Sequence, residues 1–137
     1  MSIQKQKAEA LVLSLVTGHV DPSLLTDDCV CWAPGGNSFT GETLCMMVGV
    51  LASLFEDDFT MTIDSIIEEG ERVAVISHSR GTLTDGIVYE NEYHYALIFR
   101  DEKICEMREY MNSAIVDELI RPRIQAAMIA SASESSQ

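Results

Sequence analysis

Residues 59–112, FTMTIDSIIEEGERVAVISHSRGTLTDGIVYENEYHYALIFRDEKICEMREYMN, decide the fold of this chain. Apolar and polar side chains alternate along the stretch, and a period of two is typical of β-strands. Short polar breaks interrupt the alternation, and the Asp85-Gly86 dipeptide in one of them favours a tight turn. The stretch therefore predicts an antiparallel meander of four strands, at residues 59–68, 72–83, 87–100 and 103–112.

Helical patterns lie on both sides of the meander. Before it, we expect a helix at residues 3–17, a short turn from Asp21-Pro22, a strand at 29–32 and a second helix at 42–55. The second helix is apolar nearly all round, so we expect it to be well buried. After the meander, a last helix should run from residue 113 to 129 with an interruption near Pro122.

This order of elements predicts an α+β fold. In such a fold the N-terminal helices lie on one face of a curved antiparallel β-sheet, and the long strands that curl around them leave a concave surface where a ligand can bind. The chain has 137 residues, which is the length of one domain. We place that domain at residues 1–130 and a disordered, Ser-rich tail at residues 131–137.

The charge balance excludes several classes of partner. There are 22 Asp and Glu residues against 9 Lys and Arg residues, which gives a net charge of -13. A surface this acidic repels phosphate, so we expect neither nucleic acid nor a membrane as a partner. The apolar run at residues 11–16 is too short for a signal sequence or a membrane span. We therefore expect a cytoplasmic protein.

The four cysteines, at positions 29, 31, 45 and 105, do not form a Cys-x-x-Cys motif. In the expected compartment their thiols would be reduced and mostly buried. A zinc site needs more ligands at closer spacing, so we expect no metal. Nothing in the sequence indicates an organic cofactor either.

Alternation within the strands sorts the side chains between the two faces of the sheet. In the last strand the inward set contains Cys105, Met107, Glu109 and Met111. In the third strand the inward set contains Tyr89, Asn91, Tyr93, Tyr95, Leu97 and Phe99. The second strand is open, because Val73 and Val75 compete with Ala74 and Ile76 for the inward face. If the second pair faces inward, His78 and Arg80 also point into the pocket.

Glu109 is the candidate catalytic group. A carboxylate in an apolar lining is desolvated, which raises its pKa toward the range useful for a general acid or base. His78 and Arg80 would tune this group or stabilise a developing oxyanion, although Arg80 would favour the charged carboxylate. In the alternative interpretation, Glu109 forms a structural salt bridge with Arg80 or His78. Candidate substrate-binding residues are Trp32, Asn91, Tyr93, Tyr95, Met107 and Met111.

Several segments, taken together in their order and spacing, carry a family resemblance. They are Trp32 before the Pro34-Gly35-Gly36 loop, Phe39-Thr40-Gly41 before a helix, residues 69–75, residues 81–86, residues 89–94, and residues 101–104 leading to Arg108-Glu109-Tyr110-Met111. Over about residues 8–120 the chain resembles the SnoaL-like branch of the nuclear transport factor 2-like superfamily. The resemblance implies a cone of curved sheet on three helices and a homodimer packed through the outer face of the sheet.

The resemblance also implies a range of activities. The family includes ketosteroid isomerases, polyketide cyclases, limonene-epoxide-hydrolase-like enzymes and non-catalytic binders, with pockets for small apolar molecules. Glu109 matches a carboxylate that helps to position water in the epoxide-hydrolase-like members. Those enzymes also use an Arg and an Asp two residues apart, whereas His78-Ser79-Arg80 contains no Asp. Relatives usually have Asp-Gly-Lys-Ile where this chain has Asp101-Glu102-Lys103-Ile104, a departure within a turn.

The first hypothesis for function is therefore an enzyme, an isomerase, cyclase or hydrolase, that performs acid–base chemistry on a small apolar substrate. The second is a non-catalytic module that binds a small ligand in the same pocket, and the third is a dimerisation module. The outward faces of the third and fourth strands mix Ala96, Ile98, Ile104 and Tyr110 with charges. This mixture suits a partly polar homodimer interface.

Overall fold

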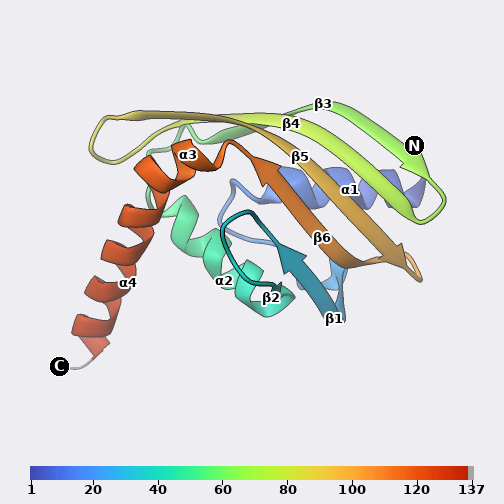
Figure 1. Ribbon diagram of the computed structural model, residues 1–137, viewed down its shortest axis with the longest axis horizontal. Helices are drawn as coiled ribbons and strands as arrows, with labels where there is room; N and C mark the ends of the chain where they lie inside the picture. Colours follow the sequence, from blue (N-terminus) through green and yellow to red (C-terminus); the bar gives the residue numbers. More distant parts are fainter. Residues whose placement is uncertain (136–137) are drawn as a thin grey trace.

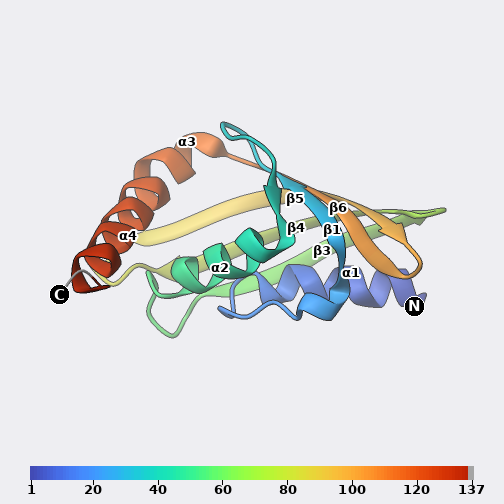
Figure 2. The same cartoon turned by 90° about the horizontal axis from the view of Figure 1, so that it is seen from below.

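A curved six-stranded sheet dominates the computed structural model, which describes residues 1–135 (Figures 1 and 2). The strand order is β2-β1-β6-β5-β4-β3; β1 runs parallel to β6 and all other neighbours are antiparallel. The strands are β1 (Leu25–Trp32), β2 (Phe39–Thr40), β3 (Thr60–Glu69), β4 (Arg72–Thr82), β5 (Val88–Arg100) and β6 (Lys103–Met111). The expected α+β fold and its meander are confirmed.

The N-terminal helix, α1 (Ile3–Ser14), covers the concave side of the sheet at β3 and β4. It begins after Ser2, whose side chain accepts a hydrogen bond from the Lys5 N–H and so caps the helix. Ala8, Leu11 and Val12 are its buried residues and join the main core. A short 3₁₀ turn, η1 (Pro22–Leu24), then leads the chain into β1.

The second helix, α2 (Gly41–Ala52), also lies on the concave side. The Thr40 side chain caps it by accepting a hydrogen bond from the Thr43 N–H. The sequence predicts that this helix is well buried, and this is wrong, because only Leu44 and Val48 are buried and Met46 is 51% exposed. One apolar face of α2 therefore does not pack fully against the sheet, and part of it lines the cavity described below.

The C-terminal segment is one long helical stretch that projects from the body of the molecule (Figure 1). It comprises α3 (Ser113–Ile115), the π-helical turn η2 (Val116–Ile120) and α4 (Arg121–Ser135). A proline ring collides with the carbonyl four residues before it, and a π-turn, with its wider spacing, relieves such conflicts. In η2 the Arg121 N–H accordingly donates to the carbonyl of Val116, five residues back. The chain thus stays helical past Pro122.

The boundary of the predicted tail needs correction. The sequence predicts a disordered tail from residue 131, but α4 is helical through Ser135. Residues 136–137 of that tail lie outside the described residues.

The register between β4 and β5 settles which face of β4 points inward. Ser77 pairs with Tyr93 and Ser79 with Asn91, and residues paired across strands lie on the same face of the sheet. Val73 and Val75 are therefore inside, with at most 1% of their surface exposed. Of the two alternatives that the sequence left open for this strand, the one with Ala74, Ile76, His78 and Arg80 facing inward is therefore excluded.

A bulge in β6 changes a second prediction. Ile98 pairs with Glu106 and Phe99 with Ile104, so Cys105 is an extra residue on β6. Ile104 consequently turns into the core and is fully buried, whereas we expected it on the outer face. Beyond the bulge the alternation is regular, so the inward position of Glu109 is as predicted.

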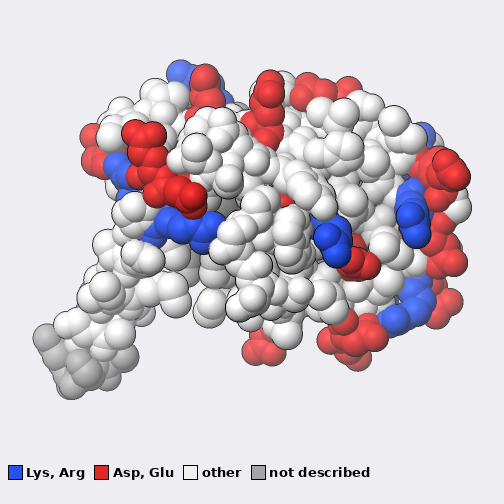
Figure 3. Space-filling view, viewed as in Figure 1, with Lys and Arg blue, Asp and Glu red and all other residues white. Residues whose placement is uncertain are grey.

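On the face shown in Figure 3, charged side chains are most numerous near the edges, and two smaller groups that contain both charges lie farther in. None of the described helices combines the length and apolar character that crossing a membrane requires.

Candidate functional site

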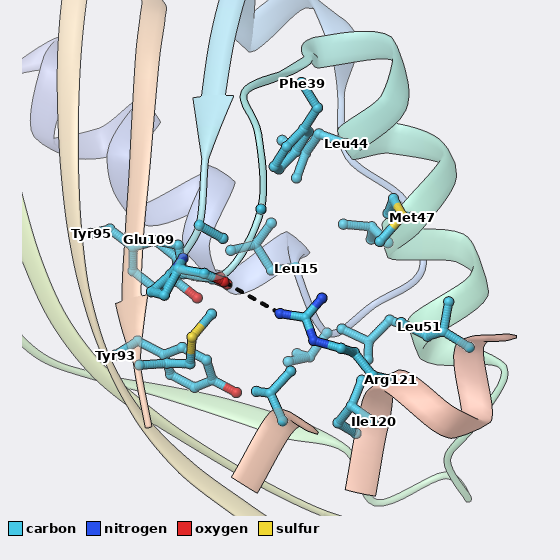
Figure 4. A pocket seen from close by; sticks show the side chains of 18 of the residues that line it. Leu15, Phe39, Leu44, Met47, Leu51, Tyr93, Tyr95, Glu109, Ile120 and Arg121 are labelled. Atoms are coloured by element: carbon cyan, nitrogen blue, oxygen red, sulfur yellow. Dashed lines mark hydrogen bonds between the residues drawn. The ribbon is translucent and has the colours of Figure 1, made fainter. Parts of the chain in front are cut away.

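A cavity of about 300 Å³ lies between the concave side of the sheet, α2 and the C-terminal helical segment (Figure 4). This volume is at the lower end of the range of about 300–1,000 Å³ typical of ligand sites. The walls are mainly apolar. Leu44, Met47, Val48 and Leu51 come from α2, Tyr89, Tyr93, Tyr95, Glu109 and Met111 from β5 and β6, and Val116, Ile120, Arg121 and Ile124 from the C-terminal segment.

Glu109 is the acid of this cavity. It stands opposite Tyr95 in the β5–β6 ladder, and both side chains line the cavity. Burial raises the pKa of the Glu109 carboxyl, and a hydrogen bond from the Tyr95 hydroxyl opposes this only in part. Glu109 therefore holds its proton at a higher pH than an exposed glutamate does. In this position it can give a proton to an apolar ligand or take one from it.

Two further tyrosines form a hydrogen-bonded chain along the sheet wall. The Tyr93 hydroxyl lies 2.8 Å from Ser79 Oγ and 3.0 Å from the Tyr89 hydroxyl, to which Asn91 Nδ2 donates at 3.1 Å. Burial raises the pKa of both phenols, so they keep their protons at neutral pH. They can act as hydrogen-bond donors but do not supply a base.

His78 and Arg80 are outside this cavity, which corrects their predicted catalytic role. His78 Nδ1 lies 2.8 Å from Asp64 Oδ2, and Arg80 Nε donates to Glu90 at 3.0 Å. Both side chains are about half exposed on the outer face of the sheet. The alternative salt bridge between Glu109 and either residue is excluded for the same reason.

Of the six candidate binding residues, Tyr93, Tyr95 and Met111 line the cavity, and three do not. Trp32 is on the outer side of β1, where it packs on Tyr110 with ring centroids 5.2 Å apart. Met107 is buried in the core, 2% exposed. Asn91 is buried, and its amide is engaged in hydrogen bonds within the protein. Its Nδ2 donates to the Tyr89 hydroxyl and to the carbonyl of Asn112, and its Oδ1 accepts from the Asn112 N–H.

Arg121 belongs to the site, although the sequence analysis did not single it out. It lines the cavity from the first turn of α4, and its side chain reaches toward the space between Glu109 and Met47 (Figure 4). Its Nη2 donates to the carbonyl of Pro34 at 3.3 Å. No periodic pattern could have placed Arg121 here, because its direction depends on the π-turn before it.

The cysteines lie elsewhere. All four are free thiols; Cys29 and Cys31 are buried, and none lines the cavity. Within residues 1–135, no group of three or more His, Cys, Asp and Glu side chains is arranged to hold a metal ion.

Comparison with known proteins supports a family assignment. A family model described as SnoaL-like domain matches residues 17–107. No curated protein sequence matches the chain.

Solved structures share the fold. BvnE pinacolase from Penicillium brevicompactum superposes with a TM-score of 0.75 at 20% identity, covering 91% of this chain and 92% of that one. IdmH from Streptomyces antibioticus, proposed to be a polyketide cyclase, has a TM-score of 0.71 at 20% identity and coverage of 82% and 94%. An NTF2-like protein from Anabaena variabilis ATCC 29413 has a TM-score of 0.69 at 23% identity, with coverage of 80% and 87%.

Identities this low establish the fold alone. The family model, in contrast, spans more than half of the sequence and matches β1 through most of β6, the segment that builds the sheet around the cavity. The chain therefore belongs to the SnoaL-like family.

Proposed function

We propose that this protein is an enzyme that performs acid–base chemistry on a small apolar substrate in the cavity. The observation that carries the proposal is the position of Glu109, a carboxyl of raised pKa in a mainly apolar wall. A carboxyl whose pKa is raised above that of an exposed glutamate holds its proton more readily, which favours its use as a general acid or base.

The tyrosines complete the proposed chemistry. Tyr89 and Tyr93 keep their protons. When Ser79 donates to Tyr93 and Tyr93 donates to Tyr89, the Tyr89 hydroxyl proton stays free and can be donated to a substrate oxygen on which negative charge develops. Isomerisation, cyclisation and opening of a strained ring by water all need such a pair of functions. A pinacolase and a proposed cyclase are among the proteins of this fold, which is consistent with this range.

A non-catalytic binding module is the second candidate, and one observation favours it. With His78 and Arg80 on the outer face, Glu109 is the one carboxylate among the lining residues, and no histidine accompanies it there. A cavity with a single titrating group of this kind also suits a protein that only holds its ligand.

Deuterium exchange separates the two candidates. Small enolisable ketones are incubated with the protein in D₂O, and exchange at the carbon next to the carbonyl is followed by NMR, with binding measured in parallel. We expect Glu109→Gln to slow the catalysed exchange by about 10²-fold or more while the dissociation constant stays nearly unchanged. Glu106→Gln is the matched control, because Glu106 lies on the same strand and pairs with Arg108 outside the cavity.

Equal exchange by the wild type and Glu109→Gln would contradict the enzymatic proposal. Binding of the ketones without any exchange would favour the binding module.

A further inference from the structure

Two ionisable side chains of different character line the cavity. Apart from the tyrosines, its titratable lining residues are Glu109 on β6 and Arg121 on α4. Burial has the largest effect on the pKa of Glu109, whose hydrogen-bond partner is Tyr95. Arg121 is hydrogen-bonded to Asp117 and to the carbonyl of Pro34. The guanidinium charge is therefore not cancelled by the acid of the same cavity.

Two contacts fix the orientation of the Arg121 guanidinium. Nε donates to Asp117, one helical turn earlier, and Nη2 donates to the carbonyl of Pro34. A Cβ on Gly35 would lie 3.1 Å from Nη2, and Gly35 has a φ of +81°, which favours glycine. The loop after β1 is thus shaped to let the guanidinium approach its backbone.

These contacts leave donors of Arg121 unused. Among the described residues, none accepts a hydrogen bond from Nη1, and Nη2 has a second N–H beyond the one given to Pro34. Asp117 is 58% exposed, so its pairing with Arg121 is well solvated and contributes little to stability.

A purely apolar ligand would suit this end of the cavity poorly. It would displace water from the unused N–H groups of Arg121 without replacing the lost hydrogen bonds, which costs binding free energy. A cationic ligand would meet a like charge. A carboxylate, an enolate or an acidic hydroxyl would instead accept two hydrogen bonds from a charged donor, the strongest arrangement available to arginine.

We propose that the natural ligand is an amphipathic anion, an apolar body with one anionic oxygen group, and that Arg121 binds this group. The inference rests on the proposed use of the cavity as a small-molecule site and narrows its substrate class. The apolar body then lies against α2 and the tyrosine wall, so the anionic end sets the direction in which the ligand meets Glu109.

Two probes of equal chain length, decanoate and 1-decanol, test the proposal by NMR titration of the labelled full chain at pH 8. We expect the wild type to bind decanoate about tenfold more tightly than decanol, with shifts at Tyr93 and Met111 identifying the cavity. Arg121→Gln should abolish this preference and leave decanol affinity nearly unchanged. Arg121→Lys keeps the charge but loses the fork, so an intermediate preference is expected.

Arg123→Gln is the matched control. Arg123 lies on the same helix and pairs with Asp85 outside the cavity, so the preference for decanoate should survive. Equal binding of both probes in the cavity, or a preference that persists in Arg121→Gln, overturns the inference but leaves the proposed function standing. Failure of both probes to reach the cavity overturns the two together.

Discussion

The carboxyl group of Glu109 is less stable as an anion in the folded chain than in water, because burial beside the cavity removes part of its hydration. One hydrogen bond from Tyr95 does not replace the lost hydration. The ionised group therefore lowers the stability of the folded state at high pH. Carboxyl groups with such shifted pKa values are common at functional sites.

This effect of the ionised group predicts a pH dependence of stability. The folded state binds the Glu109 proton more tightly than the unfolded state, whose pKa is near the ordinary value of 4.5. The stability contributed by the protonated group is present below that value and is lost as the pH rises through the raised folded pKa. We expect Glu109→Gln to become progressively more stable than the wild type as the pH rises above about 4.5, until the raised folded pKa of Glu109 has been passed.

Urea unfolding at a series of pH values measures this difference, and Glu106→Gln controls for the loss of any carboxylate from β6. A difference between Glu109→Gln and the wild type that does not change with pH would show that burial of Glu109 does not shift its titration.

At the scale of single elements, the turn between β5 and β6 has an unusual composition. Asp101 and Glu102 have φ values of +52° and +65°, so both adopt the left-handed conformation of a type I′ turn. Glycine or asparagine suits the second position, whereas a glutamate there is strained. The second turn position, Glu102, is also where the chain departs from the Asp-Gly-Lys-Ile turn of the family that it resembles.

Glu102→Gly should therefore stabilise the protein. We expect the free energy of unfolding to rise by about 0.5–1 kcal/mol, the relief of strain less the added entropy of the unfolded glycine. The hydrogen bond from Lys7 Nζ is kept, because it is accepted by the backbone carbonyl of residue 102. Glu71→Gly is the control, because Glu71 lies in the β3–β4 turn and does not have a positive φ, and this change should lower the free energy of unfolding. A lower stability of Glu102→Gly as well would contradict the left-handed turn.

The elements also show how far the sequence alone could lead. Strand alternation placed Glu109, Tyr93, Tyr95 and Met111 correctly, because the pattern beyond the Cys105 bulge is unbroken. A three-residue connection at 84–86 pairs odd-numbered residues of β4 with odd-numbered residues of β5. With that connection, Ser77 and Ser79 face inward together with Tyr93 and Asn91, as the structure shows. A two-residue turn at Asp85-Gly86 would give the opposite faces, since one residue of slip exchanges them.

The other errors have causes that periodicity does not contain. Trp32 is large enough to form part of a pocket wall. Its neighbour Cys31 faces inward, however, so Trp32 faces outward and packs on Tyr110. Arg121 reaches the cavity because of the π-turn before it. The extra residue in that turn rotates the side chains of the following helix, and a regular helical period does not predict this rotation.

At the scale of the whole molecule, the homodimer expected from the sequence stays a prediction. The outer face of the sheet carries exposed apolar side chains, among them Ile76, Ile67 and Tyr110. We expect a mass in solution of about twice 15.1 kDa, measured by light scattering at micromolar concentration.

Ile76→Glu should shift that mass to the monomer value. Met128→Glu is the matched control, because Met128 is 46% exposed and Ile76 44%, but Met128 lies on the projecting helix α4. A monomeric wild type would exclude the dimer.

The parallel pairing of β1 with β6 has a consequence for synthesis on the ribosome. Val30 pairs with Glu106 and Cys31 with Met107, so the first long strand has no neighbour on that side until the last one has been made. A nascent chain halted before residue 103 leaves Cys29 and Cys31 without the strand that buries them, open to thiol reagents. Completion of the sheet is thus a late, long-range event, and folding should be slow relative to helical chains of this size.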